Sequence, residues 1–272
     1  MDSNLPIGVF DSGVGGLTVL RAMQKRLPHE NMLYLGDTAR LPYGTKSSQT
    51  VSRYSAQAAA KLVERKIKLL VVACNTATAS ALEYLQTLWP ELPVIGVVAP
   101  GANAACAATK SGNIAVIGTE STIRNKAYHK AIAAIMPQAQ VSAVPCSLFV
   151  SLAEEGWVDG PIVEAVARRY LAPLFSSTDS VPDCLVLGCT HFPALAGAIA
   201  NTVGTGVHIV DSAATTAIAV EDALKATNGF NRQSGAGQTY FMTTDDTARF
   251  ARTGGIFLGH EVLEKDIELV NL

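Results

Sequence analysis

Residues 70–76 read Leu-Val-Val-Ala-Cys-Asn-Thr, and residues 185–191 repeat the pattern as Leu-Val-Leu-Gly-Cys-Thr-His. In both stretches a short apolar run ends in a cysteine that is followed by two polar residues. Apolar runs of this length, bounded by polar residues or glycine, are typical of buried strands. The repeat therefore indicates a duplicated unit that places one cysteine, Cys74 or Cys189, at the end of a strand in each half.

Strand-like and helix-like segments alternate along the whole chain. Short apolar, β-branched runs predict strands at 7–10, 32–35, 69–73, 94–98, 114–117, 141–144, 185–187 and 207–210. Amphipathic or alanine-rich segments between them predict helices, for example at 17–27, 47–65, 77–88, 122–136, 162–174 and 215–226. This alternation predicts an α/β fold with mostly parallel sheets flanked by helices, in which functional residues follow the carboxyl ends of the strands.

The length of 272 residues fits two domains. We expect residues 1–98 together with about 208–272 to form the first domain, which contributes Asp11 and Cys74. Residues from about 99 to 207 are expected to form the second, which contributes Cys189 and His191. If the two halves face each other, the two thiols lie on opposite sides of one cleft.

The composition is that of a compact globular protein, with 49% hydrophobic and 16% charged residues. The 21 basic and 23 acidic residues leave a net charge of −2 and no basic stripe, so nucleic acid is not expected as the primary ligand. The amino terminus lacks the pattern of a secretory signal, and prolines interrupt the long uncharged stretch 131–153. We therefore expect a cytoplasmic protein that does not enter a membrane.

The five cysteines are odd in number and show no CxxC spacing, which argues against disulfides. Cys74 and Cys189 each lie between a predicted strand and a helix start, where the helix dipole favours a thiolate. His191 and Asp11 are their candidate proton-handling neighbours. For an isolated cysteine, packing is the simpler interpretation, and it is the one that we adopt for Cys106, Cys146 and Cys184.

Residues 11–16 (DSGVGG) follow the first predicted strand. They do not match the dinucleotide or P-loop patterns, but successive backbone amides near a helix start are suited to a carboxylate. Further neutral hydrogen-bonding groups follow other predicted strands, namely Tyr43, Gly44, Asn75, Thr76 and Thr190. Cys189 and His191 are too closely spaced for a familiar zinc pattern, so no metal is expected. An acidic small molecule is the expected ligand.

Five motifs together resemble the bacterial glutamate racemases, a branch of the cofactor-independent amino-acid racemases. They are IGVFDSGVGGL at 7–17, GDTARLPYG at 36–44, ACNT at 73–76, GCTHFP at 188–193 and DSAATTA at 211–217. The resemblance implies two pseudo-symmetric α/β domains with the active site in the cleft between them. It also implies interconversion of L- and D-glutamate without a cofactor, and D-glutamate that supplies peptidoglycan synthesis, cell-wall biogenesis and cell shape. Consistent with this, no lysine stands out as a pyridoxal ligand.

The resemblance also implies roles for single residues. Cys74, assisted by Asp11, would act on D-glutamate, and Cys189, assisted by His191, on L-glutamate. Two groups are needed because inversion removes a proton from one face of the α-carbon and delivers one to the other. The positions that match substrate-binding residues are Asp11, Ser12, Tyr43, Gly44, Asn75, Thr76, Thr190 and His191. Asp37 and Glu154 match auxiliary acids, although Glu155 lies next to Glu154.

Other functions fit parts of the pattern. A related racemase acting on aspartate would share both cysteines but need a shorter pocket. A hydrolase or acyltransferase would use Cys189 with His191 and leave Cys74 without a role. A non-catalytic protein that closes on an acidic ligand would use both cysteines for packing alone. The sequence leaves open whether the chain forms a homodimer.

Overall fold

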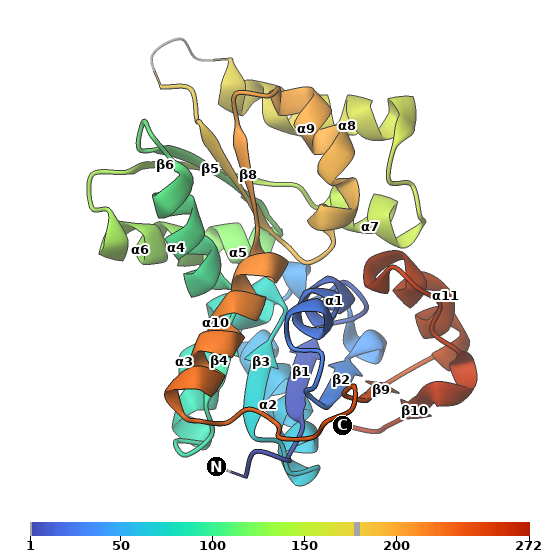
Figure 1. Cartoon of the computed structure of the whole chain (residues 1–272). Helices are drawn as coiled ribbons and strands as arrows, with labels where there is room; N and C mark the ends of the chain where they lie inside the picture. The colour runs from blue at the N-terminus through green and yellow to red at the C-terminus, as the bar shows by residue number, and fades with distance from the viewer. Residues whose placement is uncertain (1, 177–179) are drawn as a thin grey trace.

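Two parallel sheets form the centre of the computed structural model, which describes residues 2–176 and 180–272. Within these residues the first sheet has the order β10-β9-β2-β1-β3-β4 and the second the order β6-β5-β7-β8. The strands of the first sheet are β1 Ile7–Asp11, β2 Met32–Gly36, β3 Leu69–Val72, β4 Val94–Gly96, β9 Thr239–Thr243 and β10 Ile267–Leu269. Those of the second are β5 Asn113–Gly118, β6 Gln140–Pro145, β7 Cys184–Gly188 and β8 His208–Asp211. Each sheet belongs to one of two domains, which lie one above the other in Figure 1.

The two sheets repeat one topology. The order β2-β1-β3-β4 in the first matches β6-β5-β7-β8 in the second, and all the pairings within both sets are parallel. In this correspondence β3, which precedes Cys74, matches β7, which precedes Cys189. The predicted α/β fold with two pseudo-symmetric domains is therefore confirmed.

Helices cover both sheets. Their bounds are α1 Leu17–Arg26, α2 Ser48–Glu64, α3 Asn75–Leu88, α4 Val98–Ala108, α5 Glu120–Arg124, α6 Ala127–Ile135, α7 Leu148–Glu154, α8 Gly160–Phe175, α9 Ala196–Val203, α10 Ser212–Ala226 and α11 Thr247–Leu258. The single helix expected at 122–136 is wrong, because Lys126 takes a left-handed conformation that separates α5 from α6. One cluster of buried side chains, which includes Val9 and Leu187, extends through both domains.

The division of the chain between the domains differs slightly from the expected bounds. Residues 208–211 form β8, which pairs with β7 in the second sheet, so the chain returns to the first domain only after this strand. Helix α10 then begins at Ser212, with the Asp211 carboxylate accepting a hydrogen bond from the Ala213 amide, and it packs against α1 and α4. We propose a boundary near residue 212 in place of 208.

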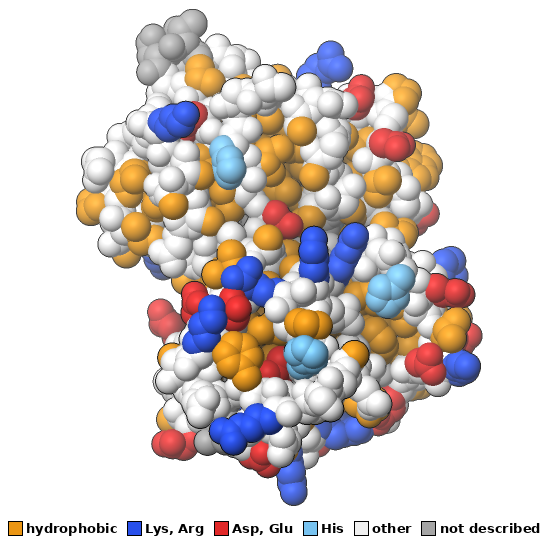
Figure 2. Space-filling view, in the orientation of Figure 1, with side chains coloured by type: hydrophobic (Ala, Val, Ile, Leu, Met, Phe, Trp, Pro, Cys, Tyr) orange, Lys and Arg blue, Asp and Glu red, His pale blue; other side chains and the backbone are white. Residues whose placement is uncertain are grey.

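Charged side chains are unevenly distributed on the face shown in Figure 2. Basic and acidic groups are interspersed on the lower, first domain, whereas the upper domain presents mostly apolar and uncharged groups. Within the described residues, no helix is both long enough and apolar enough to cross a bilayer.

Candidate active site

Strand ends from both domains meet at one small cavity, which we call the thiol pocket. Its volume is about 30 Å³. Its lining residues are Ser12, Gly13, Leu41, Pro42, Tyr43, Gly44, Cys74, Asn75, Thr76, Thr119, Val150, Glu154, Cys189, Thr190 and His191. The two cysteines singled out by the internal repeat therefore line the same cavity. Cys106, Cys146 and Cys184 are buried and are not among its lining residues.

Cys74 occupies the N-cap of α3. Its sulfur accepts a hydrogen bond from the Ala77 amide at 3.4 Å, and its thiol donates to Ser12 Oγ at 3.4 Å. Burial, followed by the nearby charge of Asp11, raises the pKa of Cys74 to about 12. The Ala77 amide at the helix start acts to lower this pKa, in the direction expected from the sequence, but burial outweighs it. At neutral pH this group is a thiol, ready to donate a proton.

Asp11 ends β1 and lies behind the pocket wall rather than on it. Its carboxylate is fully buried, and Oδ2 accepts a hydrogen bond from the Gly13 amide at 3.0 Å. Burial raises the pKa of Asp11, and the amides of residues 12, 13 and 16 oppose that rise. We expected the backbone amides of the glycine-rich loop at 11–16 to bind the carboxylate of a ligand. In the structure these amides instead contact the carboxylate of Asp11.

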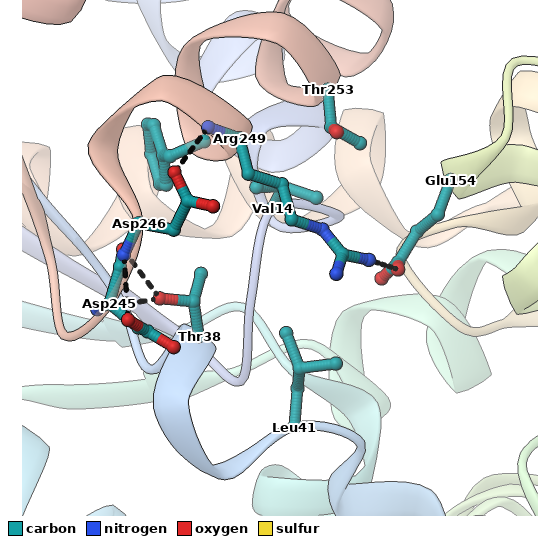
Figure 3. Close-up of a pocket in the computed structure, with 9 residues that line it drawn as sticks. Val14, Thr38, Leu41, Glu154, Asp245, Asp246, Arg249 and Thr253 are labelled. Atoms are coloured by element: carbon teal, nitrogen blue, oxygen red, sulfur yellow. Dashed lines mark hydrogen bonds and ion pairs between the residues drawn. The ribbon is translucent and has the colours of Figure 1, made fainter.

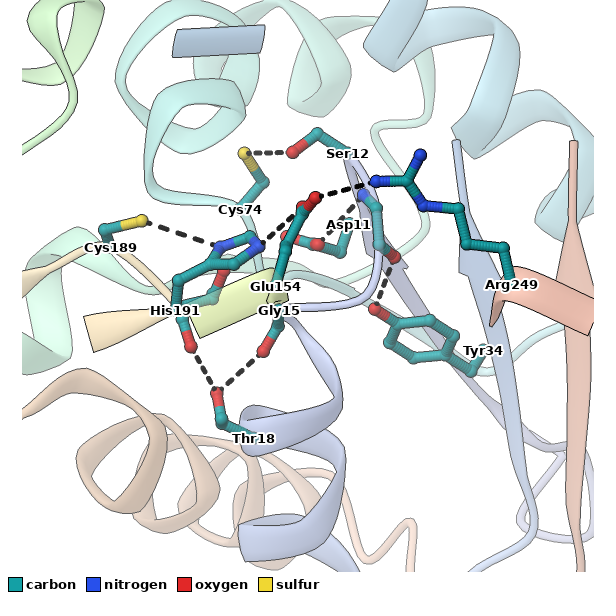
Figure 4. A network of polar contacts seen from close by, with 12 residues as sticks. Asp11, Ser12, Gly15, Thr18, Tyr34, Cys74, Glu154, Cys189, His191 and Arg249 are labelled. Atoms are coloured by element: carbon teal, nitrogen blue, oxygen red, sulfur yellow. Dashed lines mark hydrogen bonds and ion pairs between the residues drawn. The ribbon is translucent and has the colours of Figure 1, made fainter. Parts of the chain in front are cut away.

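A chain of polar contacts connects Cys189 to the surface (Figure 4). Cys189 Sγ lies 3.8 Å from His191 Nδ1, and His191 Nε2 lies 3.1 Å from Glu154 Oε1. The other oxygen of Glu154 pairs with Arg249 Nη2 at 3.3 Å. Glu155, by contrast, is exposed. The sequence left open which of the two glutamates reaches the site, and the structure brings Glu154 there.

His191 carries a positive charge at neutral pH. Burial alone would lower its pKa, but the contacts with Cys189 and Glu154, together with the charge of Asp11, raise it to about 10. For Glu154, burial acts in the opposite direction and would raise the pKa. The contacts with His191 and Arg249 outweigh burial, so the pKa of Glu154 is lowered overall. An imidazolium ion at this distance from the sulfur attracts negative charge by Coulomb's law. The two thiols therefore lie in different electrostatic surroundings.

Asp37 supports Tyr43 from behind the pocket. The Tyr43 hydroxyl donates to Asp37 Oδ2, which also pairs with Arg40 Nε at 2.7 Å, while Oδ1 accepts from the Thr244 hydroxyl at 2.9 Å. Asp37 is fully buried and is not among the residues that line the pocket. We infer that it holds the Tyr43 side chain in place.

Two glycines allow the domains to approach each other closely. A Cβ atom on Gly15 would lie 2.5 Å from both His191 Nδ1 and Thr190 Oγ1, and one on Gly44 would lie 2.6 Å from Thr119 Cβ. Thr119 also hydrogen-bonds to the Thr76 hydroxyl at 2.8 Å. A side chain at either glycine would therefore require these residues of the second domain to shift.

Sequence reasoning missed some of the residues in and around the pocket. Thr119 directly follows β5. Because functional residues of parallel sheets follow the carboxyl ends of strands, its position could have been used to predict it. Arg249 belongs to α11, far along the chain, and carries no local signal. Among the described residues, no group of three or more His, Cys, Asp or Glu side chains is arranged to hold a metal ion.

A second cavity lies beside the thiol pocket (Figure 3). It measures about 170 Å³ and shares Leu41 and Glu154 with the pocket, while Arg249 and Thr253 of α11 line its other side. Neither Cys74 nor Cys189 is part of its lining. The thiols and the donors around them therefore make the smaller cavity the candidate active site.

The sequence model of the Asp/Glu/hydantoin racemase family matches residues 7–220 of this chain. The chain belongs to that family. A glutamate racemase of Geobacter metallireducens is 52% identical to it over 253 residues, which cover 93% of this chain and 92% of that protein. The resemblance drawn from the sequence motifs is therefore confirmed.

Solved structures of racemases in this family have the same fold. The glutamate racemase of Francisella tularensis in complex with D-glutamate superimposes with a TM-score of 0.91 at 36% identity, covering 99% of this chain and 98% of that one. The glutamate racemase of Thermus thermophilus in complex with β-chloro-D-alanine gives a TM-score of 0.89 at 40% identity and covers 100% and 99% of the two chains.

Proposed function

We propose that this protein interconverts L- and D-glutamate with two cysteines as its acid and base. The observation that carries the proposal is that Cys74 and Cys189, from equivalent strand ends of two repeated domains, line one pocket. Full-length similarity to glutamate racemases supports glutamate as the substrate. Two thiols on opposite domains suit a reaction that needs one proton-transfer group on each face of a carbon atom.

In the direction from L- to D-glutamate, Cys189 starts as a thiolate, and its sulfur removes the α-proton. The electron pair of the broken C–H bond then resides on the α-carbon and its carboxylate, and the Cys74 thiol delivers a proton to the opposite face. Cys189 ends the cycle as a thiol and Cys74 as a thiolate, so the reverse reaction uses the same groups in exchanged roles. The high pKa of the Cys74 thiol and the imidazolium ion beside Cys189 suit this direction.

The α-proton of an amino acid is far less acidic than a thiol, so the pocket must stabilise the developing negative charge. The donors available for that purpose are neutral side chains on strand-end loops, namely Ser12, Tyr43, Asn75, Thr76 and Thr190. The thiols and most of these donors are buried, and a buried environment strengthens each of these interactions. We propose that these side chains bind the two carboxylates of glutamate, and that Asp11 acts on Cys74 electrostatically from behind the wall.

The proposed cellular role follows from the product. D-Glutamate made in the cytoplasm would supply peptidoglycan synthesis and thereby cell-wall biogenesis and cell shape. A strain that depends on added D-glutamate, and that grows without it when this chain is expressed, would support this role. Growth restored equally by a variant that lacks both cysteines would contradict it.

Deuterium incorporation tests the proposed reaction directly. Purified protein, freed of metal and pyridoxal phosphate, is incubated with L-glutamate in deuterated water while optical rotation and α-deuterium content are followed. We expect rotation to decay to zero and deuterium to enter the α-position, whereas L-aspartate in a parallel incubation stays unchanged. Turnover of aspartate alone would favour the aspartate racemase, and no turnover of either would favour the hydrolase or the binding protein.

Glu154 is expected to set the alkaline limit of turnover. Activity should fall as the pH rises through about 10, where His191 loses its proton. Glu154→Gln removes a carboxylate that helps to raise the His191 pKa, so the fall should move to lower pH. Profiles of kcat from neutral to alkaline pH measure the shift, with Glu155→Gln as the control on the exposed neighbour. An alkaline limb that stays in place in Glu154→Gln would contradict this role.

Gly15→Ala tests the close approach of the two domains. The added methyl group would lie 2.5 Å from His191 Nδ1, so His191 must move, and displacement of a catalytic group by about 1 Å lowers the rate roughly 10²-fold. Gly197→Ala is the matched control, because a Cβ atom there meets nothing within 4 Å. Measured kcat/KM should fall for the first variant only. Equal activity of the two variants would show that the contact tolerates the methyl group.

A further inference from the structure

Tyr128 contacts a residue of the thiol pocket without lining the pocket itself. It lies near the start of α6 in the second domain and is 2% exposed. Its hydroxyl donates a hydrogen bond to Oδ1 of Asn75 at 2.7 Å. Asn75 begins α3 in the first domain and lines the pocket together with both thiols. This buried hydrogen bond therefore connects the two domains beside the reacting groups.

Two glycines fix the position of the Tyr128 ring. A Cβ atom on Gly101 of α4 would lie 3.2 Å from the ring and its hydroxyl oxygen, and one on Gly188 would lie 3.0 Å from Cε2 of the ring. Gly188 ends β7 and immediately precedes Cys189. The ring of Tyr128 therefore occupies space that is free only because Gly101 and Gly188 have no side chains. In this position its hydroxyl contacts Asn75.

The other end of the Asn75 amide has no protein partner in the described residues. Its Nδ2 atom is buried and makes no hydrogen bond, although Asn75 is only 2% exposed. A buried amide nitrogen without an acceptor is unfavourable unless a ligand supplies one. Because Tyr128 occupies the oxygen, the amide can offer the pocket only its N–H donors.

Tyr128 keeps its proton and so remains a donor. Burial raises its pKa, as does negative charge at Cys189 and Asp211, while a contact with the Ser212 hydroxyl opposes the rise. Ser212 belongs to the DSAATTA motif, to which the proposed reaction gives no other role. A neutral tyrosine hydroxyl can also accept a hydrogen bond. Here it donates to Oδ1, and this bond holds the amide with Nδ2 directed away from Tyr128.

We propose that Tyr128 is a positioning residue that fixes the Asn75 amide with its N–H donors toward the substrate, so that the site selects a carboxylate over the corresponding amide. The inference rests on the proposed function, since it concerns how glutamate is recognised. A carboxylate oxygen of the substrate accepts a hydrogen bond from Nδ2 of Asn75. If an amide nitrogen took the place of that oxygen, its N–H group would face the N–H group of Asn75, and neither could accept a hydrogen bond from the other. Sites built on such hydrogen bonds discriminate strongly because a mismatch leaves buried polar groups unpaired.

Tyr128→Phe tests the proposal while it keeps the ring that fills the space beside Gly101 and Gly188. We expect kcat to stay within about twofold and the KM for glutamate to rise about three- to tenfold. The freed Asn75 amide can turn its oxygen toward the substrate. The affinity for glutamine or for the α-amide of glutamate, divided by the affinity for glutamate, should therefore be at least about tenfold higher in this variant than in the unmodified protein. The amide that gains affinity shows whether Asn75 binds the side-chain carboxylate or the α-carboxylate.

Tyr170→Phe is the matched control, because it also removes a hydrogen-bonded hydroxyl from the second domain but outside the pocket. Inhibition constants of both amides, the KM for glutamate and the melting temperature are measured for each variant. In an Asn75→Ala background, Tyr128→Phe should change none of the affinity ratios. A Tyr128→Phe variant that melts normally and keeps the unmodified KM and ratios would overturn the positioning role.

A second variant covers the case in which Tyr128→Phe does not fold. Asn75→Asp retains the acceptor for Tyr128 but turns an oxygen toward the pocket, so glutamate should bind at least about 100-fold more weakly and one of the two amides should then bind better than glutamate. Unchanged preference for glutamate would overturn the inference. Absence of glutamate racemisation by the unmodified protein would instead refute the proposed function, which separates the two failures.

Discussion

Cys74→Ala and Cys189→Ala are each expected to lower kcat/KM for glutamate by at least about 10³-fold, the scale that general acid or base groups contribute. Either change removes the proton-transfer group from one face of the α-carbon, and the other thiol cannot reach that face. Because L- and D-glutamate have equal free energies in solution, the loss of kcat/KM must be the same in both directions. Polarimetry of the purified variants measures it.

Isotope exchange distinguishes loss of a catalytic group from general damage. In each variant the remaining thiol is expected to exchange the α-hydrogen of one isomer with deuterated water and return it to the same face, without inversion. Cys74→Ala should retain exchange of L-glutamate alone, and Cys189→Ala that of D-glutamate alone. Cys106→Ala, a change to a cysteine outside the pocket, should retain full racemisation. Racemisation near the unmodified rate in either pocket variant would contradict the two-cysteine mechanism.

The strand pattern predicted the fold because parallel strands are buried on both faces and form continuous apolar runs. The runs that became β1, β3, β5 and β7 all have this character, and each of these four strands is buried along nearly its whole length. The expectations did not include β9 and β10. β9 is only partly buried, and β10 has three residues, two of them exposed. β9 pairs with β2, and β10 pairs with β9 at the edge of the sheet. These pairings depend on tertiary contacts that a local pattern does not carry.

The positions of both pocket cysteines were predictable for a different reason. Each follows a buried strand directly, and the repeat of the pattern indicated that their surroundings are equivalent. The contacts of Tyr128 and Arg249 were not predictable, because both residues lie within helices and reach their partners only when the chain has folded. The high pKa of Cys74 was not predictable either, since the extent of burial depends on the folded pocket and not on one strand end.

Lys68→Met is expected to lower the free energy of unfolding by about 3–5 kcal/mol, the usual cost of breaking a buried ion pair. Lys68 is 2% exposed, and its Nζ lies 2.5 Å from Glu30 Oε2 and donates to the carbonyl oxygens of Ser3 and Gly229 at 2.8 Å. The substitution leaves the Glu30 carboxylate buried without its counter-ion. Urea denaturation followed by circular dichroism measures the change.

Two further variants show whether the cost comes from the uncompensated charge. Lys61→Met breaks a partly exposed pair with Glu64 and should cost no more than about 1 kcal/mol. Removing both charges with Lys68→Met and Glu30→Met should recover much of the stability lost by Lys68→Met alone. A loss for Lys68→Met no larger than that for Lys61→Met would contradict the argument.

The same variants separate stability from catalysis. Lys68 immediately precedes β3 and Cys74 lies beyond its other end, so the ion pair and the thiol pocket occupy opposite edges of one sheet. At temperatures at which Lys68→Met stays folded, its kcat and KM should therefore match those of the unmodified protein. A parallel sheet gathers its reactive side chains at the carboxyl edge, and the amino edge is then free to carry interactions that stabilise the fold.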